Sequence, residues 1–207
     1  MALPRDDDLM AKGTMTTIVA VTGATGAVYA KRLLELLPGK KMLVVTAHGK
    51  EVVEHELEGG LGALQERATE LLDNDDLGAE VSSGTGPGRQ MVIVPCSMNT
   101  LSKIACGLAD NLVTRAASVC LKEGWRLVLV PRESPLSLIH IENMSRLKRA
   151  GAAIVPASPG FYGKPQSIED LVDFVVGKVL NALGMEDIAR EAVKPWRGMK
   201  RESKNKH

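Results

Sequence analysis

Residues Thr17–Ala27 read TIVAVTGATGA, and this stretch decides the fold class. Its first six residues form an apolar, β-rich run that stops at Gly23, and leucines at helical spacing follow over Ala27–Leu37. A strand, a glycine-rich turn and a helix in this order begin a βαβ unit, whose strands are parallel. The stretch therefore predicts an α/β protein.

The same alternation continues along the chain. Further apolar strands are predicted at Met42–Thr46, Met91–Pro95, Arg126–Val130 and Ala153–Val155, and helices at Lys50–Glu58, Asn111–Glu123, Ser137–Ala150 and Ile168–Leu183. Gly59–Asp76 is interpreted as one amphipathic helix and Gly84–Gly88 as a loop. Right-handed crossovers between these strands predict a three-layer αβα doubly wound parallel sheet, Rossmann- or flavodoxin-like, in a single domain.

Length and charge bound the organisation of the chain. We expect residues 1–16 to form a flexible leader, 17–185 the folded domain and 186–207 a basic C-terminal tail. The formal net charge of +1 and an aromatic content of 3% give no reason to expect binding to nucleic acid. Apolar runs stay shorter than the about 18 residues that cross a bilayer, so we expect a cytoplasmic protein.

Cysteine and histidine spacing argues against a metal site. Cys96, Cys106 and Cys120 form no CxxC pair, and we interpret them as buried free thiols. His48 and His55 stand seven residues apart and are interpreted as surface or capping residues. No metal is therefore expected.

Ligands of doubly wound sheets bind at the carboxyl ends of the strands. The turn Gly23–Gly26 lies there, beside free N–H groups of the following helix, so an anion or a flavin edge suits it. It lacks the third glycine of a dinucleotide fingerprint and the lysine of a P-loop. Ser97–Thr100 offer hydroxyls and an amide to a phosphate or a flavin ring, although ordinary helix capping is the favoured explanation for Ser97 or Thr100 taken alone.

Charged residues gather around the fourth predicted strand. Arg115 and Lys122 share one side of the preceding helix, and Arg132 and Glu133 follow the strand directly. A solvated helix face explains the first pair, but it explains poorly an Arg-Glu pair at the end of a buried strand. We expect Glu133 to be paired with cations there. Tyr162 adds a phenol after the next strand.

Together these residues resemble the UbiX family of flavin prenyltransferases, over about Thr17 to Trp196. The motifs that carry the resemblance are Ser97-Met98-Asn99-Thr100-Leu101, Asp110-Asn111-Leu112, Arg115-Ala116-Ala117, Leu121-Lys122-Glu123, Leu127-Val128-Leu129-Val130-Pro131-Arg132-Glu133, Pro135-Leu136-Ser137, His140-Ile141-Glu142-Asn143-Met144 and Phe161-Tyr162.

The resemblance implies binding of reduced FMN and its conversion to prenylated FMN. By the resemblance, the residues that hold FMN are Gly23, Ala24, Thr25, Thr46, Ser97, Met98, Asn99, Thr100, Arg115 and Arg132. Dimethylallyl phosphate would be held by Tyr162, Lys178, Lys122 and Arg132, and the reacting groups would be Glu133, Lys122, Tyr162 and Glu56.

The resemblance also implies partners. It implies a UbiD-type decarboxylase as recipient of prenylated FMN, and a homo-oligomer, commonly a dodecamer, with sites at subunit boundaries. Trp196 stands where the family has a C-terminal tryptophan.

Three residues depart from the family's pattern. Thr25 replaces the serine of a GASGA turn, Thr46 replaces a serine after the second strand, and Lys178 replaces an arginine. Hydroxyl and charge survive in each case, but lysine lacks the planar fork that pairs a phosphate through two hydrogen bonds.

Two other functions remain open from the sequence. A related flavoenzyme decarboxylates a C-terminal or phosphopantothenoyl cysteine and has a similar loop at Pro95–Thr100, but it needs a catalytic histidine, for which His48 is the candidate. A non-catalytic FMN carrier or accessory subunit would bind the flavin and return it unchanged.

Overall fold

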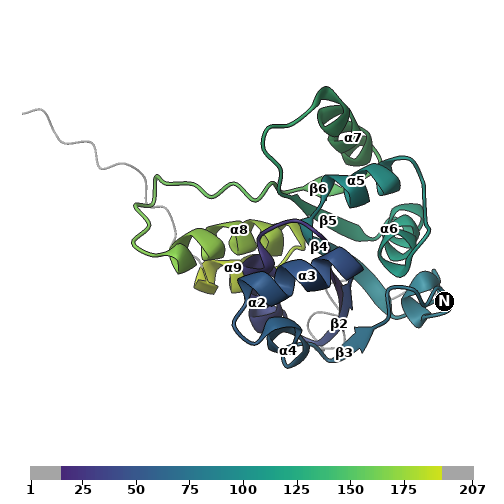
Figure 1. Ribbon diagram of the computed structural model, residues 1–207, viewed down its shortest axis with the longest axis horizontal. Coiled ribbons are helices and arrows are strands. Elements are labelled where there is room, and N and C mark those ends of the chain that lie inside the picture. Colours follow the sequence, from purple (N-terminus) through teal and green to yellow (C-terminus); the bar gives the residue numbers. More distant parts are fainter. Residues whose placement is uncertain (1–14, 193–207) are drawn as a thin grey trace, which may run out of the picture.

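A computed structural model describes residues 15–192, which form one parallel six-stranded sheet between two layers of helices (Figure 1). The strands are β1 Thr16–Val21, β2 Lys40–Val45, β3 Glu70–Leu72, β4 Gly88–Cys96, β5 Arg126–Pro131 and β6 Ala153–Ile154. Residues 1–14 of the expected leader, and Trp196 in the tail, lie outside the described residues.

The strand order is β3-β2-β1-β4-β5-β6. The chain therefore winds outward from β1 in one direction as far as β3, and then returns to the other side of β1 and winds through β4 to β6. The predicted doubly wound fold is confirmed. Between β1 and β4 the winding direction reverses, and such a switch point leaves a crevice at the carboxyl ends of the strands, where ligands bind.

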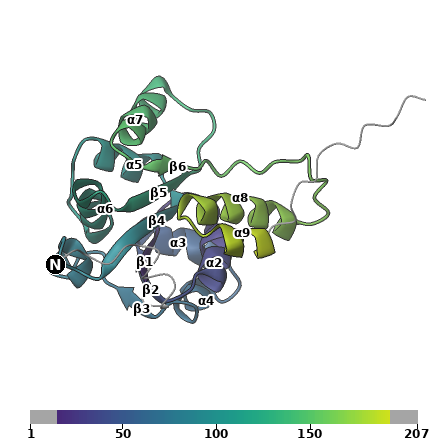
Figure 2. The same cartoon turned by 180° about the vertical axis from the view of Figure 1, so that it is seen from behind.

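Helices cover both faces of the sheet, as Figures 1 and 2 show from opposite sides. The helices are α2 Ala27–Leu36, α3 Ala47–Glu56, α4 Gly60–Gln65, α5 Met98–Ala105, α6 Leu112–Glu123, α7 Leu138–Arg149, α8 Ile168–Ala182 and α9 Glu186–Ala192, with a 3-10 turn, η1, at Glu80–Ser82. α2 and α8 pack on one face and α5 and α6 on the other.

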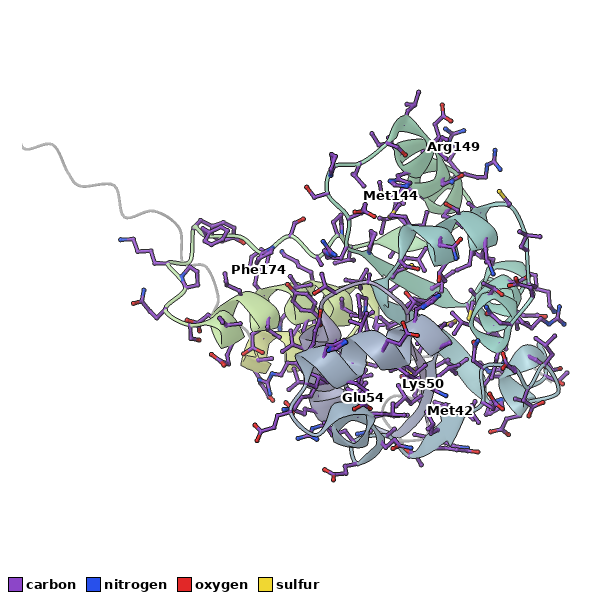
Figure 3. The ribbon with its side chains drawn as sticks, viewed as in Figure 1. Met42, Lys50, Glu54, Met144, Arg149 and Phe174 are labelled. Atoms are coloured by element: carbon purple, nitrogen blue, oxygen red, sulfur yellow. The ribbon has the colours of Figure 1, made fainter. Side chains whose placement is uncertain are left out.

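Alternation within each strand explains why the strands read as continuous apolar runs. In β1, Val19 and Val21 belong to the cluster under α2 and α8, whereas Ile18 and Ala20 belong to the cluster under α5 and α6. Both faces of a covered parallel sheet need apolar side chains. On the second face, the side chain of Met144 from α7 packs against this cluster (Figure 3).

The interpretation of Gly59–Asp76 as one helix is wrong. Only α4, six residues long, is helical there, and Glu70–Leu72 form β3, which pairs with Met42–Val44 of β2. The strand lies at the sheet edge and is half-buried, so its composition carries no continuous apolar signal.

Two smaller features also differ from expectation. Cys96 and Cys120 are buried as expected, but Cys106 is exposed at the end of α5. Within residues 186–207, the described part forms α9, which packs on α8 and buries Ala189.

Among residues 15–192 no helix has the length and apolar character that crossing a membrane requires.

Candidate functional site

Thr22 ties together the two strand ends that flank the switch point. Its side chain is fully buried, and its Oγ1 donates to the carbonyl oxygen of Pro95 at 2.9 Å. The same hydroxyl accepts from the N–H of Ser97 at 2.7 Å, and the N–H of Thr22 also donates to Pro95 at 3.3 Å. This network fixes the ends of β1 and β4 relative to each other, and it was not predicted from the sequence.

The first turn has two glycines for separate structural reasons. Gly26 precedes α2 with φ 114°, a left-handed conformation that favours glycine. At Gly23 an added Cβ would lie 2.7 Å from Cβ of His48, so the glycine lets α3 approach β1. The glycines thus shape the turn, and what the turn offers to a ligand comes from its other groups.

Glu56 occupies the N-terminus of α2. Its Oε2 accepts from the N–H groups of Gly26 and Ala27 at 2.8 and 2.7 Å, and its Oε1 accepts from the hydroxyl of Thr25. A carboxylate at a helix N-terminus is stabilised by these donors and by the helix dipole. A second anion is therefore disfavoured at this turn, which leaves the flavin edge as the better of the two ligands expected here.

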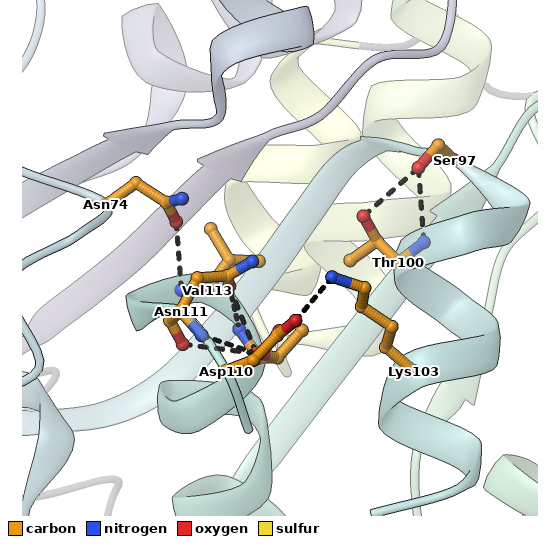
Figure 4. A network of polar contacts seen from close by, with 8 residues as sticks. Asn74, Ser97, Thr100, Lys103, Asp110, Asn111 and Val113 are labelled. Atoms are coloured by element: carbon orange, nitrogen blue, oxygen red, sulfur yellow. Dashed lines mark hydrogen bonds and ion pairs between the residues drawn. The ribbon is translucent and has the colours of Figure 1, made fainter. Parts of the chain in front are cut away.

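The N-terminus of α5 presents donors instead. Ser97 caps the helix by accepting from the N–H of Thr100 at 3.3 Å, and its own hydroxyl donates to Oγ1 of Thr100 at 3.1 Å (Figure 4). Met98 and Thr100 are buried, whereas Asn99 is exposed. The capping interpretation of Ser97 is thus confirmed, and Asn99 is the exposed residue of the first turn, where its amide is accessible to a ligand.

Thr46 ends β2 in the same row of strand ends. Its Oγ1 caps α3 by accepting from the N–H of Gly49 at 3.1 Å, and it lies 3.5 Å from the carbonyl oxygen of Val21 in β1. A dinucleotide-binding sheet has a carboxylate near this point to hold a ribose. A hydroxyl stands here instead.

Arg132 and Glu133 follow β5 at the same edge. Both are exposed, and Glu133 Oε1 accepts from the N–H of Ser134 at 2.9 Å. The N–H of Arg132 donates to the carbonyl of Cys96 at 3.4 Å, which places this residue next to the start of α5. Among residues 15–192 no ion pair joins Glu133 to Arg132 or to another cation, so the expected pairing does not form within one chain, where both side chains are exposed.

Tyr162 and Lys178 meet on a third residue, Phe174. The Tyr162 and Phe174 ring centroids lie 5.7 Å apart with the ring planes at 77°, and Lys178 Nζ lies 5.5 Å from the Phe174 centroid. The loop that carries Tyr162 starts beside β5, since the N–H of Ala157 donates to the carbonyl of Pro131 at 3.0 Å. Phe174 was not predicted as a site residue, because a phenylalanine at this helical spacing is typical of a core position.

Arg115 and Lys122 lie apart from the other predicted site residues. Arg115 Nε donates to the carbonyl of Ser82 in η1 at 3.0 Å, and Lys122 pairs with Glu123 in the last turn of α6. That turn leads into the start of β5, whereas Glu133 follows its end. Six residues of β5 span about 20 Å, so the charge cluster expected around this strand does not form within one chain.

Cys96 and His48 are the cysteine and the histidine closest in sequence to the ends of β4 and β2. Burial raises the pKa of the Cys96 thiol to about 12, which keeps it protonated and inert. His48 is exposed, and its Nδ1 lies 3.0 Å from Glu51 Oε2. The structure gives neither side chain the environment of a nucleophile or a fixed general base.

The described residues define a class: an open parallel sheet with its polar groups at the switch point, typical of proteins that bind nucleotides or flavins. The chain matches the family model described as Flavoprotein over residues 8–180. It is 50% identical over 184 residues to the flavin prenyltransferase UbiX of Methanothermobacter thermautotrophicus, covering 87% of this chain and 95% of that protein. The chain therefore belongs to the UbiX family of flavin prenyltransferases.

Two solved structures extend the likeness. AnUbiX (PadA1), in complex with FMN and dimethylallyl pyrophosphate, has a TM-score of 0.86 and 39% identity, covering 90% of this chain and 99% of that one. A dodecameric FMN-dependent UbiX-like decarboxylase from Escherichia coli O157:H7 has a TM-score of 0.85 and 42% identity, covering 89% and 100% of the two chains. Both are similar to this chain over essentially the whole described fold.

Proposed function

We propose that the protein joins a dimethylallyl group from dimethylallyl phosphate to reduced FMN and so makes prenylated FMN. One observation supports this beyond family membership. The polar groups proposed to bind flavin at the switch point share a sheet edge with the charged Arg132 and Glu133. The loop after β6 starts at the same edge, and its Tyr162 contacts the ring on which Lys178 also lies. A carrier that only stores FMN has no use for those additional groups.

The residues present fit FMN. The α5 N-terminus and Asn99 supply donors, Thr46 supplies a hydroxyl in place of the carboxylate that would hold a ribose, and the first turn presents backbone and the Glu56 carboxylate. FMN would thus be held by Gly23, Ala24, Thr25, Thr46, Ser97 to Thr100 and Arg132, with Arg115 supplied as described below. When bound and reduced, the flavin supplies electron-rich ring atoms for the new bonds to carbon.

The chain's own charged groups manage the leaving phosphate and the proton. As the C–O bond of the allylic phosphate breaks, the electron pair leaves with the phosphate, so the Lys178 ammonium and the Tyr162 hydroxyl stabilise the growing negative charge. Glu133 then accepts the proton that ring closure releases. Glu56 stays hydrogen-bonded at the α2 N-terminus as a second carboxylate beside the flavin.

Arg115 and Lys122 require another copy of the chain if they act at the site. Lys122 ends α6 beside Gly84, which precedes β4, and so lies at the opposite edge of the sheet from Glu133, while Arg115 is held by the carbonyl of Ser82 in η1. A homo-oligomer that brings the α6 surface of one subunit to the carboxyl edge of another would unite them. We therefore propose a homo-oligomer with shared sites, of the dodecameric size known for the similar Escherichia coli protein.

A UbiD-type decarboxylase is the proposed recipient of the product. The proposal rests on the resemblance to the UbiX family, and the chemistry adds only that a modified flavin made by a dedicated enzyme is used by another protein. Cysteine decarboxylation is less well supported, since His48 is exposed and pairs with Glu51.

Anaerobic incubation with reduced FMN tests the proposed function. Dimethylallyl phosphate and dimethylallyl pyrophosphate are supplied separately, and the released flavin is analysed by mass spectrometry. We expect flavin heavier by one C5H8 unit with the monophosphate. Unmodified flavin with both donors would indicate a carrier, and carbon dioxide release from a peptide with a C-terminal cysteine would indicate the decarboxylase.

A further inference from the structure

We propose that Phe174 is the positioning residue of the donor-phosphate site: its ring holds Tyr162 and Lys178 in the arrangement that grips the phosphate of dimethylallyl phosphate. This inference rests on the proposed function. Phe174 itself carries no group that could bond to phosphate, so it acts through its two neighbours.

Phe174 belongs to helix α8, and its ring packs against the loop that follows β6, at Gly160 (Figure 3). Tyr162 meets its ring in a T-shaped contact, and Lys178, four residues further along α8, places its ammonium 5.5 Å from the ring centroid. The loop backbone also packs on both rings, because a Cβ added at Gly160 would lie 2.8 Å from Tyr162 and 2.9 Å from Phe174. The ring is thus in contact with every part of this cluster.

Both side chains need such a support. Tyr162 lies in a loop and is 53% exposed, and Lys178 is exposed with four rotatable bonds. The negative face of an aromatic ring attracts an ammonium, and aromatic pairs favour the edge-to-face arrangement. One ring therefore contacts two exposed side chains, at the place where the family's arginine, with its rigid planar fork, is replaced by lysine.

Packing alone is the competing explanation. Phe174 is half-buried and also contacts the apolar cluster beneath α8. If it only stabilised the fold, its loss would lower the melting temperature and weaken FMN and donor binding alike. If it positions the phosphate-binding groups, donor binding would suffer selectively.

The variants Phe174→Leu and Phe174→Met separate these explanations. Methionine fills more of the ring's volume but has no ring quadrupole, so it serves if the leucine variant folds poorly. Phe174→Tyr keeps the ring. The matched control is Phe161→Leu, which removes the only other phenylalanine of the chain, an exposed side chain in the same loop as Tyr162.

Donor affinity is measured by calorimetric titration of dimethylallyl phosphate into the FMN-loaded protein. We expect about fivefold weaker binding for Phe174→Leu and Phe174→Met, equivalent to about 1 kcal/mol, the scale of one cation–π or aromatic contact. FMN affinity and kcat at saturating donor should change less than about twofold, so that the loss appears in KM. Phe174→Tyr and Phe161→Leu should bind the donor as the wild type does.

A double-mutant cycle with Lys178→Ala completes the test. Because Phe174 acts partly through Lys178, Phe174→Leu should cost less in the Lys178→Ala background than in the wild type. Full additivity, or equal losses of FMN and donor affinity, would overturn the inference. Failure of the wild type to form prenylated FMN overturns the proposed function instead, and that result is read from the wild type alone.

Discussion

The two halves of the candidate site are built differently. At the switch point, the fully buried Thr22 hydroxyl joins β1 to the start of α5 by hydrogen bonds of 2.9 and 2.7 Å. After β5 and β6, by contrast, Arg132, Glu133 and Tyr162 are exposed on loops. The proposed flavin half, at the switch point, is therefore fixed by the fold of one chain, whereas the proposed donor half, after β5 and β6, leaves its polar side chains exposed.

The difference bears on how the reaction is protected. An allylic cation formed in water is captured by water, so prenyl transfer needs a dry site. One chain does not enclose Glu133, and its Lys122 lies at the far edge of the sheet. We infer that the neighbouring subunit both covers the donor half and supplies its missing cations. Variants in the two halves should consequently fail in different ways.

The largest effect is expected for Glu133→Gln. The amide keeps the size and hydrogen-bonding capacity of the side chain but does not accept a proton, so completed prenyl-flavin should form at least ~10²-fold more slowly. FMN should bind nearly as in the wild type, because the flavin half is unchanged. Stopped-flow absorbance with reduced FMN and dimethylallyl phosphate, followed by mass analysis, measures the rate of prenyl-flavin formation. Flavin fluorescence titration measures FMN affinity.

Glu66→Gln is the control for this variant, since its carboxylate is 79% exposed at the end of α4. Wild-type rates of ring closure in a folded Glu133→Gln protein would assign proton transfer to the released phosphate or to Glu56.

Thr22→Val tests the fixed half. The substitution preserves shape but leaves the partly buried N–H of Ser97 without its partner, which lowers the free energy of unfolding by about 1 kcal/mol. FMN affinity should fall as well, because α5 loses its tie to β1. Urea unfolding and flavin fluorescence titration measure the two effects.

Thr17→Val is the matched control, because its buried hydroxyl accepts from Gln90 Nε2 at 2.6 Å at the other end of the same strand. It should lower stability similarly and leave FMN affinity unchanged. Equal losses of affinity in both variants would mean that β1 supports the flavin only through general stability.

Lys178→Ala tests the donor half. We expect about tenfold weaker binding of dimethylallyl phosphate, the scale of one charge-assisted hydrogen bond, with little change for FMN. Lys148→Ala, which removes an exposed ammonium from α7, should change neither. Calorimetric titration measures the affinity for both ligands. Equal losses of FMN affinity and donor affinity in Lys178→Ala would mean that this lysine supports the fold.

More of the fold than of the candidate site could be predicted from the sequence, and the reasons are physical. Strands covered on both faces, such as β1 and β4, contain continuous apolar runs that are recognisable in the sequence. The three-residue edge strand β3 is half-buried and has no comparable apolar run. Residues directly after strands were placed correctly at the carboxyl edge, because parallel strands end together.

Contacts between distant segments escaped prediction. Glu56 caps α2 from thirty residues away, and nothing in local spacing specifies that contact. The seven-residue spacing of Arg115 and Lys122 predicts that both lie on one side of α6. Which edge of the sheet Lys122 reaches depends instead on the length and direction of the helix. Phe174 has the sequence pattern of a core residue even though it joins Tyr162 to Lys178.

The smallest effect is expected behind the flavin half, where Glu35 of α2 pairs with Arg67 at 2.9 Å and with Arg32 at 3.3 Å. Burial tends to raise the pKa of the Glu35 carboxyl, but hydrogen bonds from Arg67 and Arg32 outweigh it and hold the pKa below 4.5. A carboxyl whose pKa is lower in the folded state stabilises the protein above its unfolded pKa, and this contribution is lost as the pH falls through the folded value. Glu35→Gln should therefore be less stable than the wild type near neutral pH, by under about 1 kcal/mol for such partly exposed pairs. The two proteins should converge in acid, well below pH 4.5. Urea unfolding midpoints at neutral and acidic pH measure this difference, and FMN affinity at neutral pH should be the same in both, because no atom of Glu35 belongs to the switch point. A stability difference that persists unchanged in acid would show that Glu35 stabilises α2 through its packing and not through its charge.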